Sequence, residues 1–228
     1  MPSMCRKTWI VIPAWNESTH LPDVLRGLKG LPYQVVVVDD GSADSTADAA
    51  KLAGVWVLRH LVNRGQGAAL RTGIDFAIKQ GAQTIVTFDA DGQHRAADLR
   101  TLLKPIEDET ADLVLGSRFL GSCPGIPTLR KLLLKSAVLF TRATTGLRLT
   151  DAHNGLRAMS RQAAERIRFT EDGMAHASQI ISIAARERLR ITEIPCTISY
   201  TSQTLAKGQS NKAALTILGR LVISRLTR

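Results

Sequence analysis

Short apolar runs rich in β-branched residues recur along the chain, separated by longer stretches of mixed polarity. The clearest run, 35–38, is four consecutive valines and leads directly into two aspartates. Runs of this kind are typical of strands buried on both faces, as in a parallel sheet. The strands predicted in this way lie near 8–13, 34–39, 55–59, 84–89, 111–116 and 191–199.

The stretches between these runs are long enough for the crossover helices that parallel strands require. The alternation therefore predicts an α/β fold with a mostly parallel mixed sheet and helices on both faces. The chain has 228 residues and no evident linker, so we expect residues 1–228 to form a single domain.

Two later segments have the pattern of amphipathic helices. Residues 129–140 are apolar around much of a helix and begin with cations, which suits contact with lipid or with a protein core. Residues 211–227 carry one polar, mainly basic stripe on a broad apolar surface, which is typical of a helix at a membrane interface. The alternative is an ordinary helix packed on the sheet or on a second subunit, so a homo-oligomer stays open.

Polar side chains follow several of the predicted strands at their carboxyl ends, where open α/β sheets bind ligands. Asp89 and Asp91 come directly after one run and are followed by Gln93. Paired oxygen ligands suit Mg²⁺ or Mn²⁺, which commonly bridge to substrate phosphates. The alternative is a solvated turn, since Asp, Gly and Gln are common loop residues.

Two other strand ends contribute to the same edge. One carries Asp39 and Asp40, and the first strand stops at a loop that contains Pro13 and Glu17. The segment 63–69 opens the following helix with Gly65 and Gly67. These glycines would allow close backbone approach to a ligand and leave helix N–H groups for phosphate, although a plain turn fits equally well.

Charge is distributed unevenly along the chain. Residues 1–117 contain 12 Lys and Arg against 14 Asp and Glu, whereas residues 118–228 contain 18 against 6. The second half therefore predicts an anionic partner. An anionic membrane surface fits better than nucleic acid, because aromatic residues are few and no nucleic-acid motif is present.

Cysteine content and hydropathy indicate the compartment. Three cysteines without metal-like spacing predict neither a disulfide framework nor a zinc site. No apolar run reaches the roughly 20 residues of a membrane span, and no signal peptide precedes the first strand. We therefore expect a cytoplasmic protein that is peripheral at the inner face of the membrane.

At this point the order and spacing of the motifs identify a family. The segments IVIPAWNES, VVVVDDGSADST, NRGQGAALRTG, FDADGQH and LVLGSR resemble the family 2 glycosyltransferases of GT-A fold. The resemblance is to the polyprenyl-phosphate (dolichol-phosphate-like) mannosyl- and glucosyltransferase branch. Further stretches, including TDAHNGLRAMSR and EIPCTISYT, resemble bacterial glycosyltransferases of cell-surface polysaccharide assembly.

The resemblance implies a metal-dependent inverting enzyme that uses a nucleotide-sugar donor, GDP- or UDP-linked. Asp91 would ligate Mg²⁺ or Mn²⁺ with Asp89 and Gln93 as co-ligands, and 1–117 would be the nucleotide- and metal-binding half. Together with the strand-end residues, the nucleotide-binding set is Pro13, Ala14, Glu17, Asp39, Asp40, Gly65, Gly67, Asp89 and Ala90.

Residues 118–228 would form the acceptor-binding half. A polyprenyl phosphate offers an ionised oxygen as nucleophile, so transfer to it needs charge neutralisation and positioning but no strong base. The candidates for holding its phosphate are Arg118, Arg130, Lys131 and Lys207. Asp151 would position the acceptor or support the metal, so that the predicted catalytic residues are Asp91, Arg118 and Asp151.

Alternatives to this function stay open. Similar bacterial proteins usually have Glu after a segment like 176–178, whereas this chain has Gln179, which cannot act as a base toward a sugar hydroxyl. His153 and His176 are the nearby substitutes. The other possibilities are transfer to a glycan hydroxyl and a nucleotide-sugar-binding module without catalysis. A sugar-1-phosphate nucleotidyltransferase is disfavoured, because the loop 13–17 lacks its Gly-rich signature.

Overall fold

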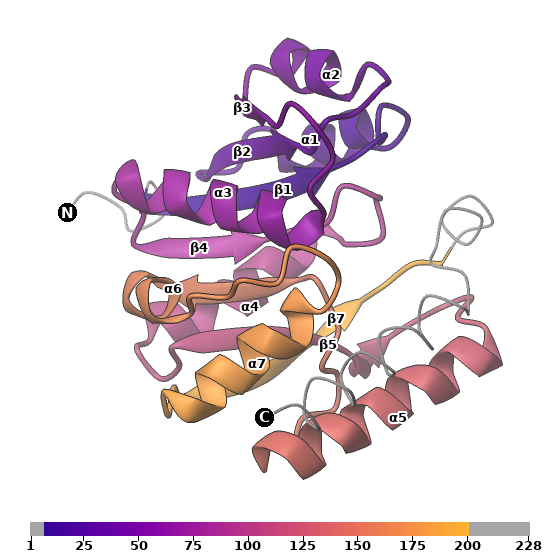
Figure 1. Cartoon of the computed structure of the whole chain (residues 1–228), viewed down its shortest axis with the longest axis vertical. Coiled ribbons are helices and arrows are strands. Elements are labelled where there is room, and N and C mark those ends of the chain that lie inside the picture. Colours follow the sequence, from indigo (N-terminus) through magenta and orange to yellow (C-terminus); the bar gives the residue numbers. More distant parts are fainter. Residues whose placement is uncertain (1–6, 201–228) are drawn as a thin grey trace.

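The computed structural model describes residues 7–200. One seven-stranded sheet runs through them, with the strand order β3-β2-β1-β4-β6-β5-β7 (Figure 1). The strands are β1 (Thr8–Ala14), β2 (Gln34–Asp39), β3 (Trp56–Arg59), β4 (Thr84–Thr87), β5 (Leu113–Ser122), β6 (Arg157–Ser160) and β7 (Ile191–Thr197). The mixed, mostly parallel α/β sheet predicted from the sequence is confirmed.

Strands β1 to β4 pair in parallel, and their carboxyl ends meet at one edge of the sheet. Strand β6 lies antiparallel between β4 and β5, and β7 extends the sheet in parallel with β5. The sequence prediction missed β6, because its four residues include an arginine and a serine and form no apolar run.

Helices cover both faces of the sheet, as predicted. They are α1 (Leu21–Leu28), α2 (Thr46–Leu52), α3 (Gln66–Lys79), α4 (Leu99–Glu107), α5 (Thr128–Thr145), α6 (Arg161–Arg166) and α7 (His176–Arg186), with a short 3₁₀ turn η2 (Ala96–Asp98) before α4.

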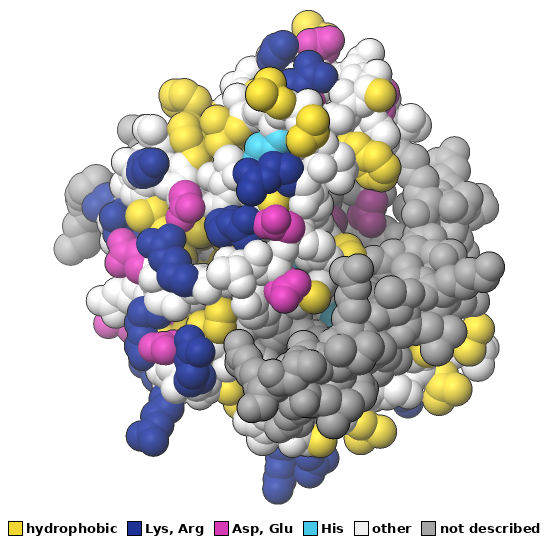
Figure 2. All heavy atoms as spheres, viewed as in Figure 1, with side chains coloured by type: hydrophobic (Ala, Val, Ile, Leu, Met, Phe, Trp, Pro, Cys, Tyr) yellow, Lys and Arg dark blue, Asp and Glu magenta, His cyan; other side chains and the backbone are white. Residues whose placement is uncertain are grey.

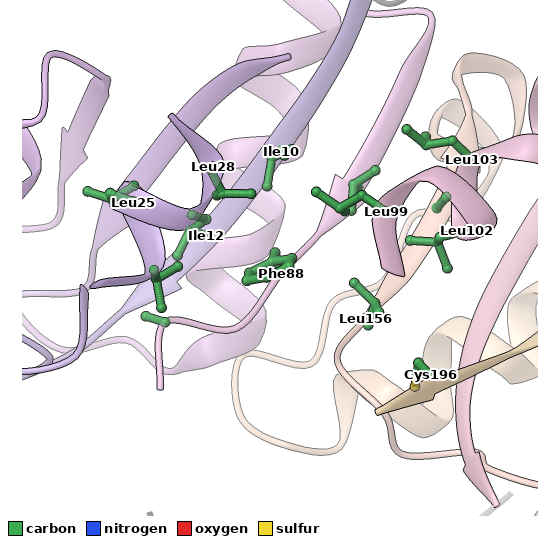
Figure 3. Packing of buried hydrophobic residues seen from close by; sticks show 14 of the residues in the cluster. Ile10, Ile12, Leu25, Leu28, Phe88, Leu99, Leu102, Leu103, Leu156 and Cys196 are labelled. Carbon is green, nitrogen blue, oxygen red and sulfur yellow. The ribbon is translucent and has the colours of Figure 1, made fainter. Parts of the chain in front are cut away.

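Two buried clusters hold the layers together. One packs α1 and α4 on the sheet, and the other packs α3, α6 and α7 on the opposite face. Figure 3 shows Ile10 and Ile12 of β1 beside Leu28 of α1, with Phe88 between this group and Leu99 of α4. Helices pack on both faces of β1, β4 and β6, so these strands are held rigidly. The loops at their ends therefore start from fixed positions.

Several predicted boundaries were inaccurate. Strand β4 ends at Thr87, so Phe88 and Asp89 already belong to the loop. Strand β5 runs to Ser122, beyond the predicted end at 116, and α5 extends past the predicted 129–140 at both ends. The pattern of polar and apolar residues therefore locates the centre of an element better than its ends.

The predicted helix 211–227 and Lys207 lie outside the described residues. No helix within residues 7–200 combines the length and apolar character needed to cross a bilayer.

Candidate functional site

A cavity of about 610 Å³ opens at the carboxyl ends of β1, β2 and β4. Loops from the first half of the chain line one side of it, and α5 with the loops around β6 lines the other. The predicted residues that line it are Pro13, Ala14, Glu17, Asp40, Gly65, Asp89, Ala90, Asp91, Gln93, Arg118 and Arg130. Residues distant in the sequence therefore meet at one site, as the strand ends predicted.

Asp89 is held in place by side chains on both of its oxygens. Gln66 donates from Nε2 to Oδ1 at 3.0 Å, and His94 Nε2 lies 3.0 Å from Oδ2. Burial alone would raise the pKa of Asp89, but the hydrogen bond from His94 and the charges of His94 and Arg157 outweigh it and lower the pKa. Asp89 is consequently a fixed negative charge at the base of the cavity.

The close approach of Gly155 helps to place this carboxylate. A Cβ atom on Gly155 would lie 2.0 Å from Asp89 Oδ2, so only glycine fits there. The loop carrying Gly155 is fixed in turn, because Thr87 donates from Oγ1 to the Gly155 carbonyl at 2.6 Å.

Asp91 lies in an electrostatically unfavourable position. Its Oδ1 accepts a hydrogen bond from the Gln93 amide at 3.0 Å, and burial together with the charge of Asp89 raises its pKa to about 6. Asp89 is compensated by His94 and Arg157. Asp91, in contrast, carries a charge that its surroundings disfavour, and a divalent cation would stabilise that charge.

The protein donors available to such a cation are few. Within residues 7–200, no group of three His, Cys, Asp or Glu side chains is arranged to hold a metal by itself. This fits Mg²⁺ or Mn²⁺, since such ions often take one or two carboxylates and complete their ligand set with substrate phosphates and water. Asp89, Asp91 and Gln93 are thus suitable ligands.

Two further carboxylates of the cavity are each paired with a histidine. Glu17 Oε2 lies 2.9 Å from His20 Nδ1, and Asp40 Oδ1 lies 2.6 Å from His60 Nδ1. Asp40 also accepts hydrogen bonds from the amides of Arg64 and Gly65, and thereby fixes the loop before α3.

The neighbouring Asp39 is not among the residues that line the cavity. Its side chain is fully buried, accepts a hydrogen bond from the Ser42 amide at 3.0 Å and pairs with Arg59 at 3.0 Å. Asp39 therefore stabilises the turn after β2, and its assignment to the nucleotide-binding set stays a prediction.

The glycines at the start of α3 were expected to approach a ligand phosphate, but a loop of the protein packs against this end of the helix. The Ala68 amide donates to the Asp172 carbonyl at 3.2 Å, and a Cβ atom on Gly67 would lie 2.1 Å from the Glu171 carbonyl oxygen. The loop 171–173 therefore occupies this helix terminus. Gly67 serves packing against that loop, although Gly65 does line the cavity.

Gln179 belongs to the support of that same loop. Its Oε1 accepts hydrogen bonds from the amides of Thr170 and Glu171 at 2.8 and 2.9 Å, and its Nε2 donates to Thr170 Oγ1. Because the side chain is engaged there and does not line the cavity, its identity gives no evidence of lost catalysis.

Arg118 and Asp151 form a buried ion pair beside the cavity. Arg118 donates from Nε to Asp151 Oδ2 at 2.6 Å, and its backbone amide bonds the same oxygen. Glu193 on β7 accepts hydrogen bonds from the amides of Thr150 and Asp151. Asp151 is thus a support for Arg118, which lines the cavity.

Helix α5 supplies an apolar wall with one cation. Arg130, Leu133, Leu134, Ala137 and Phe140 line the cavity at helical spacing. Lys131 is exposed and does not line it, because the next position of a helix points about 100° away. The structure therefore separates Arg130 from Lys131, which the sequence had grouped together.

Arg157 lies beneath the site as the largest of the almost fully buried side chains. Its Nε and Nη1 have no hydrogen-bond partner among the described residues. Burial lowers the pKa of Arg157 to about 10, and burial together with the Arg157 charge lowers the pKa values of His153 and His176 to about 4. Neutral imidazoles with such low pKa values are weak bases.

The sequence model described as "Glycosyl transferase family 2" matches residues 9–168. The chain belongs to glycosyltransferase family 2.

Relatives within this family share nearly the whole chain. An undecaprenyl-phosphate mannosyltransferase of Micrococcus luteus is 35% identical over 226 residues, covering 94% of this chain and 90% of that protein. A polyprenol monophosphomannose synthase of Mycolicibacterium smegmatis is 33% identical, with coverages of 88% and 79%. A UDP-N-acetylglucosamine–dolichyl-phosphate N-acetylglucosaminyltransferase of Methanococcus voltae is 29% identical, with coverages of 96% and 96%.

Solved structures establish the same GT-A fold. Glucosyl-3-phosphoglycerate synthase from Mycobacterium tuberculosis, crystallised with Mn²⁺ and UDP-glucose, has a TM-score of 0.74 at 19% identity. The match covers 97% of this chain and 78% of that one. The protein is a glycosyltransferase of family 2 with this fold.

Several residues of the site were missed by sequence reasoning. They are Trp15, Asn63, Gln66, His94, Asn154, Gly155 and Met174, all of which line the cavity. The apolar positions of α5 were noticed only as a helix pattern. The strand-end rule finds carboxylates that follow apolar runs, but it gives no signal for a residue such as Gly155 that acts by lacking a side chain.

Proposed function

We propose that this family 2 glycosyltransferase transfers a hexose from a GDP- or UDP-linked sugar to a polyprenyl phosphate, with inversion at the anomeric carbon and with Mg²⁺ or Mn²⁺. The observation that carries the proposal is the division of the cavity. Carboxylates lie on the side of β1, β2 and β4, whereas Arg118, Arg130 and the apolar residues of α5 lie on the other.

The carboxylate side suits the donor. Glu17 and Asp40 supply hydrogen-bond acceptors for a nucleoside, and Asp89, Asp91 and Gln93 are the ligands for the cation. When bound, the cation would neutralise the diphosphate and its charge as leaving group. The protein keeps Asp89 fixed through Gln66 and His94, so little reorganisation is needed when donor and cation enter.

The α5 side suits a lipid phosphate. A guanidinium binds phosphate oxygens through paired N–H donors, and the wall of Leu133, Leu134, Ala137 and Phe140 provides an apolar surface for the first part of a hydrocarbon chain. Relatives named for mannose and for N-acetylglucosamine transfer share a polyprenyl-phosphate acceptor in their names. The acceptor class is thus better supported than the sugar.

The reaction itself would be a direct displacement. The ionised phosphate oxygen attacks the anomeric carbon, the bond from that carbon to the nucleoside diphosphate breaks, and the departing oxygen keeps the electron pair. No proton is removed from such an acceptor, which agrees with the low pKa values of His153 and His176. Arg118 and Arg130 hold the acceptor phosphate and reduce its repulsion from the donor.

We further propose that α5 meets the membrane surface with its outer side. Leu129, Leu132 and Leu139 are 52%, 62% and 65% exposed, and Lys131 and Lys135 are exposed among them. Figure 2 shows hydrophobic side chains along the lower right edge of the molecule, where α5 lies in Figure 1. One side of the helix would thus contact lipid while the other lines the acceptor site.

The test is release of nucleoside diphosphate by the full chain from a panel of GDP- and UDP-sugars with Mn²⁺, with and without a short polyprenyl phosphate. We expect release with one donor and only when the lipid phosphate is present. Release with a glycan acceptor but not with the lipid phosphate would favour the sugar-hydroxyl alternative. Donor binding without release under any condition would favour a non-catalytic binding module.

Substitution of two adjacent cations on α5 tests the proposed phosphate site. Arg130→Ala should raise the acceptor KM at least about tenfold, since a charge-assisted contact is lost. Lys131→Ala is the matched control and should leave the KM for a short, soluble acceptor unchanged, because Lys131 does not line the cavity. Equal effects of the two substitutions would contradict the assignment.

A further inference from the structure

Tyr200 connects the two arginines of the cavity. Arg118 donates from Nη1 to the Tyr200 hydroxyl at 2.5 Å, and the guanidinium carbon of Arg130 lies 5.1 Å from the centroid of the Tyr200 ring. The Tyr200 residue is only 7% exposed, so both contacts are sheltered from water. The Tyr200 hydroxyl thus contacts Arg118, and the Tyr200 ring contacts Arg130.

The backbone around Tyr200 is fixed from two directions. The Tyr200 amide donates to the Pro124 carbonyl, and the preceding amide of Ser199 donates to the Gln93 carbonyl, both at 3.1 Å. Gly125 has a φ of 79°, and a Cβ atom there would lie 2.5 Å from the Tyr200 carbonyl oxygen. The segment 199–200 thus joins the loop of the carboxylate pair to the loop that precedes α5.

These contacts orient the arginines without using all of their donors. Among the described residues, the Arg118 side chain bonds Asp151 through Nε and Tyr200 through Nη1, and no bond is made by Nη2. Arg130 lies over an aromatic face, a contact that leaves its in-plane N–H groups available. Donors therefore remain on both side chains for an anion in the cavity.

We propose that Tyr200 is a positioning residue for the acceptor: its hydroxyl orients Arg118 and its ring orients Arg130 toward one phosphate group. The inference rests on the proposed function, because it takes the ligand of these arginines to be the phosphate of the acceptor. Tyr200 touches neither donor nor acceptor and acts through the two guanidinium groups.

Two substitutions separate the two contacts. Tyr200→Phe keeps the ring and should raise the acceptor KM about fivefold through loss of one hydrogen bond to Arg118. Tyr200→Leu removes the ring as well and should raise it severalfold more. The donor KM should change less than about twofold, because the carboxylate side of the cavity is untouched. The assay uses the full chain, Mn²⁺ and a short polyprenyl phosphate.

Tyr33→Phe is the matched control. Tyr33 directly precedes β2 and so lies at the opposite edge of the sheet, where loss of a phenol hydroxyl should leave both KM values unchanged. Thermal unfolding of every variant shows whether a change in KM reflects the site or the fold.

A second measurement tests the coupling. Arg118→Lys should raise the acceptor KM in the wild-type background but have less effect in Tyr200→Phe, since the contact that it would lose is already absent. Additive effects would overturn the proposal, as would an acceptor KM in Tyr200→Phe equal to that of the wild type. The Phe variant suffices for this decision even if Tyr200→Leu does not fold.

The outcome also distinguishes the inference from the proposed function. If Arg118→Ala and Arg130→Ala raise the acceptor KM while both Tyr200 variants do not, the acceptor site stands and the role of Tyr200 is wrong. If neither arginine substitution changes the acceptor KM, the phosphate site itself is wrong and Tyr200 has no such role.

Discussion

Asp91 illustrates how a single residue can be unfavourable for folding and useful for binding. Its pKa of about 6 means that the folded state holds the ionised carboxylate less well than the unfolded chain, whose ordinary value is 3.8. The free energy of unfolding therefore falls as the pH rises from about 4 to about 6, because Asp91 ionises more readily in the unfolded chain. Above that range the folded protein carries a constant free-energy penalty for the ionised Asp91. A bound cation would remove that cost.

Asp91→Asn should therefore stabilise the metal-free protein at pH 7.5. The rise in pKa of roughly two units corresponds to about 1–3 kcal/mol, which the neutral amide would recover. The measurement is urea unfolding in EDTA and again in Mn²⁺ with nucleoside diphosphate. The wild type should gain stability from the ligands and the variant should not. A destabilised variant in EDTA would contradict this account of Asp91.

The raised pKa of Asp91 also leads us to expect that metal binding depends on pH. Below pH about 6 Asp91 takes up a proton, which competes with the cation, so Mn²⁺ affinity should fall by up to about tenfold for each further pH unit. Electron paramagnetic resonance of free Mn²⁺ in titrations at pH 5.0 to 8.0 measures this directly. A constant affinity across pH 5 to 7 would show that Asp91 is not a ligand.

At the scale of elements, the loop before β6 limits the space available to Asp89. Gly155→Ala would place a Cβ atom 2.0 Å from Asp89 Oδ2, so the carboxylate must move. We expect Mn²⁺ affinity and transfer to fall at least about tenfold while the protein stays folded, since a displacement of about 1 Å has effects of this size at catalytic sites.

Gly27→Ala provides the control for that substitution. Gly27 lies within α1, and a Cβ atom there would meet its nearest neighbour at 4.0 Å, so activity should be unchanged and stability equal or higher. Circular dichroism of both variants would show whether each of them folds. Unaltered Mn²⁺ affinity in Gly155→Ala would mean that Asp89 is not needed in its present position.

Helix α5 has two sides that can be tested separately. Leu132→Glu and Leu139→Glu change the exposed side, and they should weaken sedimentation with anionic vesicles without altering transfer to a short, soluble acceptor. Leu52→Glu is the control, because Leu52 is 90% exposed on α2. If vesicle binding is the same in all three variants, α5 does not contact the membrane.

At the scale of the whole molecule, the uneven charge of the sequence is partly neutralised by folding. Arg168 and Arg190 of the basic half pair with Asp75 and Asp112 of the other half. Figure 2 shows Lys and Arg side chains intermixed with acidic ones on the face formed by α3, α6 and α7. The acidic and basic halves of the sequence are thus not two separate surfaces, and the cavity draws on both.

The sequence by itself determined the strands other than β6 and the edge of the sheet that carries the chemistry. Four consecutive β-branched residues, as in 35–38, favour a strand buried within a sheet, and the polar residues that follow then lie at the strand end. Asp40, Asp89 and Asp91 were found in this way. The local sequence is sufficient to predict such residues, because each strand and the loop that follows it are contiguous in the chain.

Only the tertiary structure decided which side chains support the site. The insertion of β6 between β4 and β5 brings Gly155 against Asp89, and the loop 171–173 reaches the start of α3. Tyr200 meets Arg118 from 82 positions away. Such contacts depend on packing between segments far apart in the sequence, for which no single segment carries a pattern.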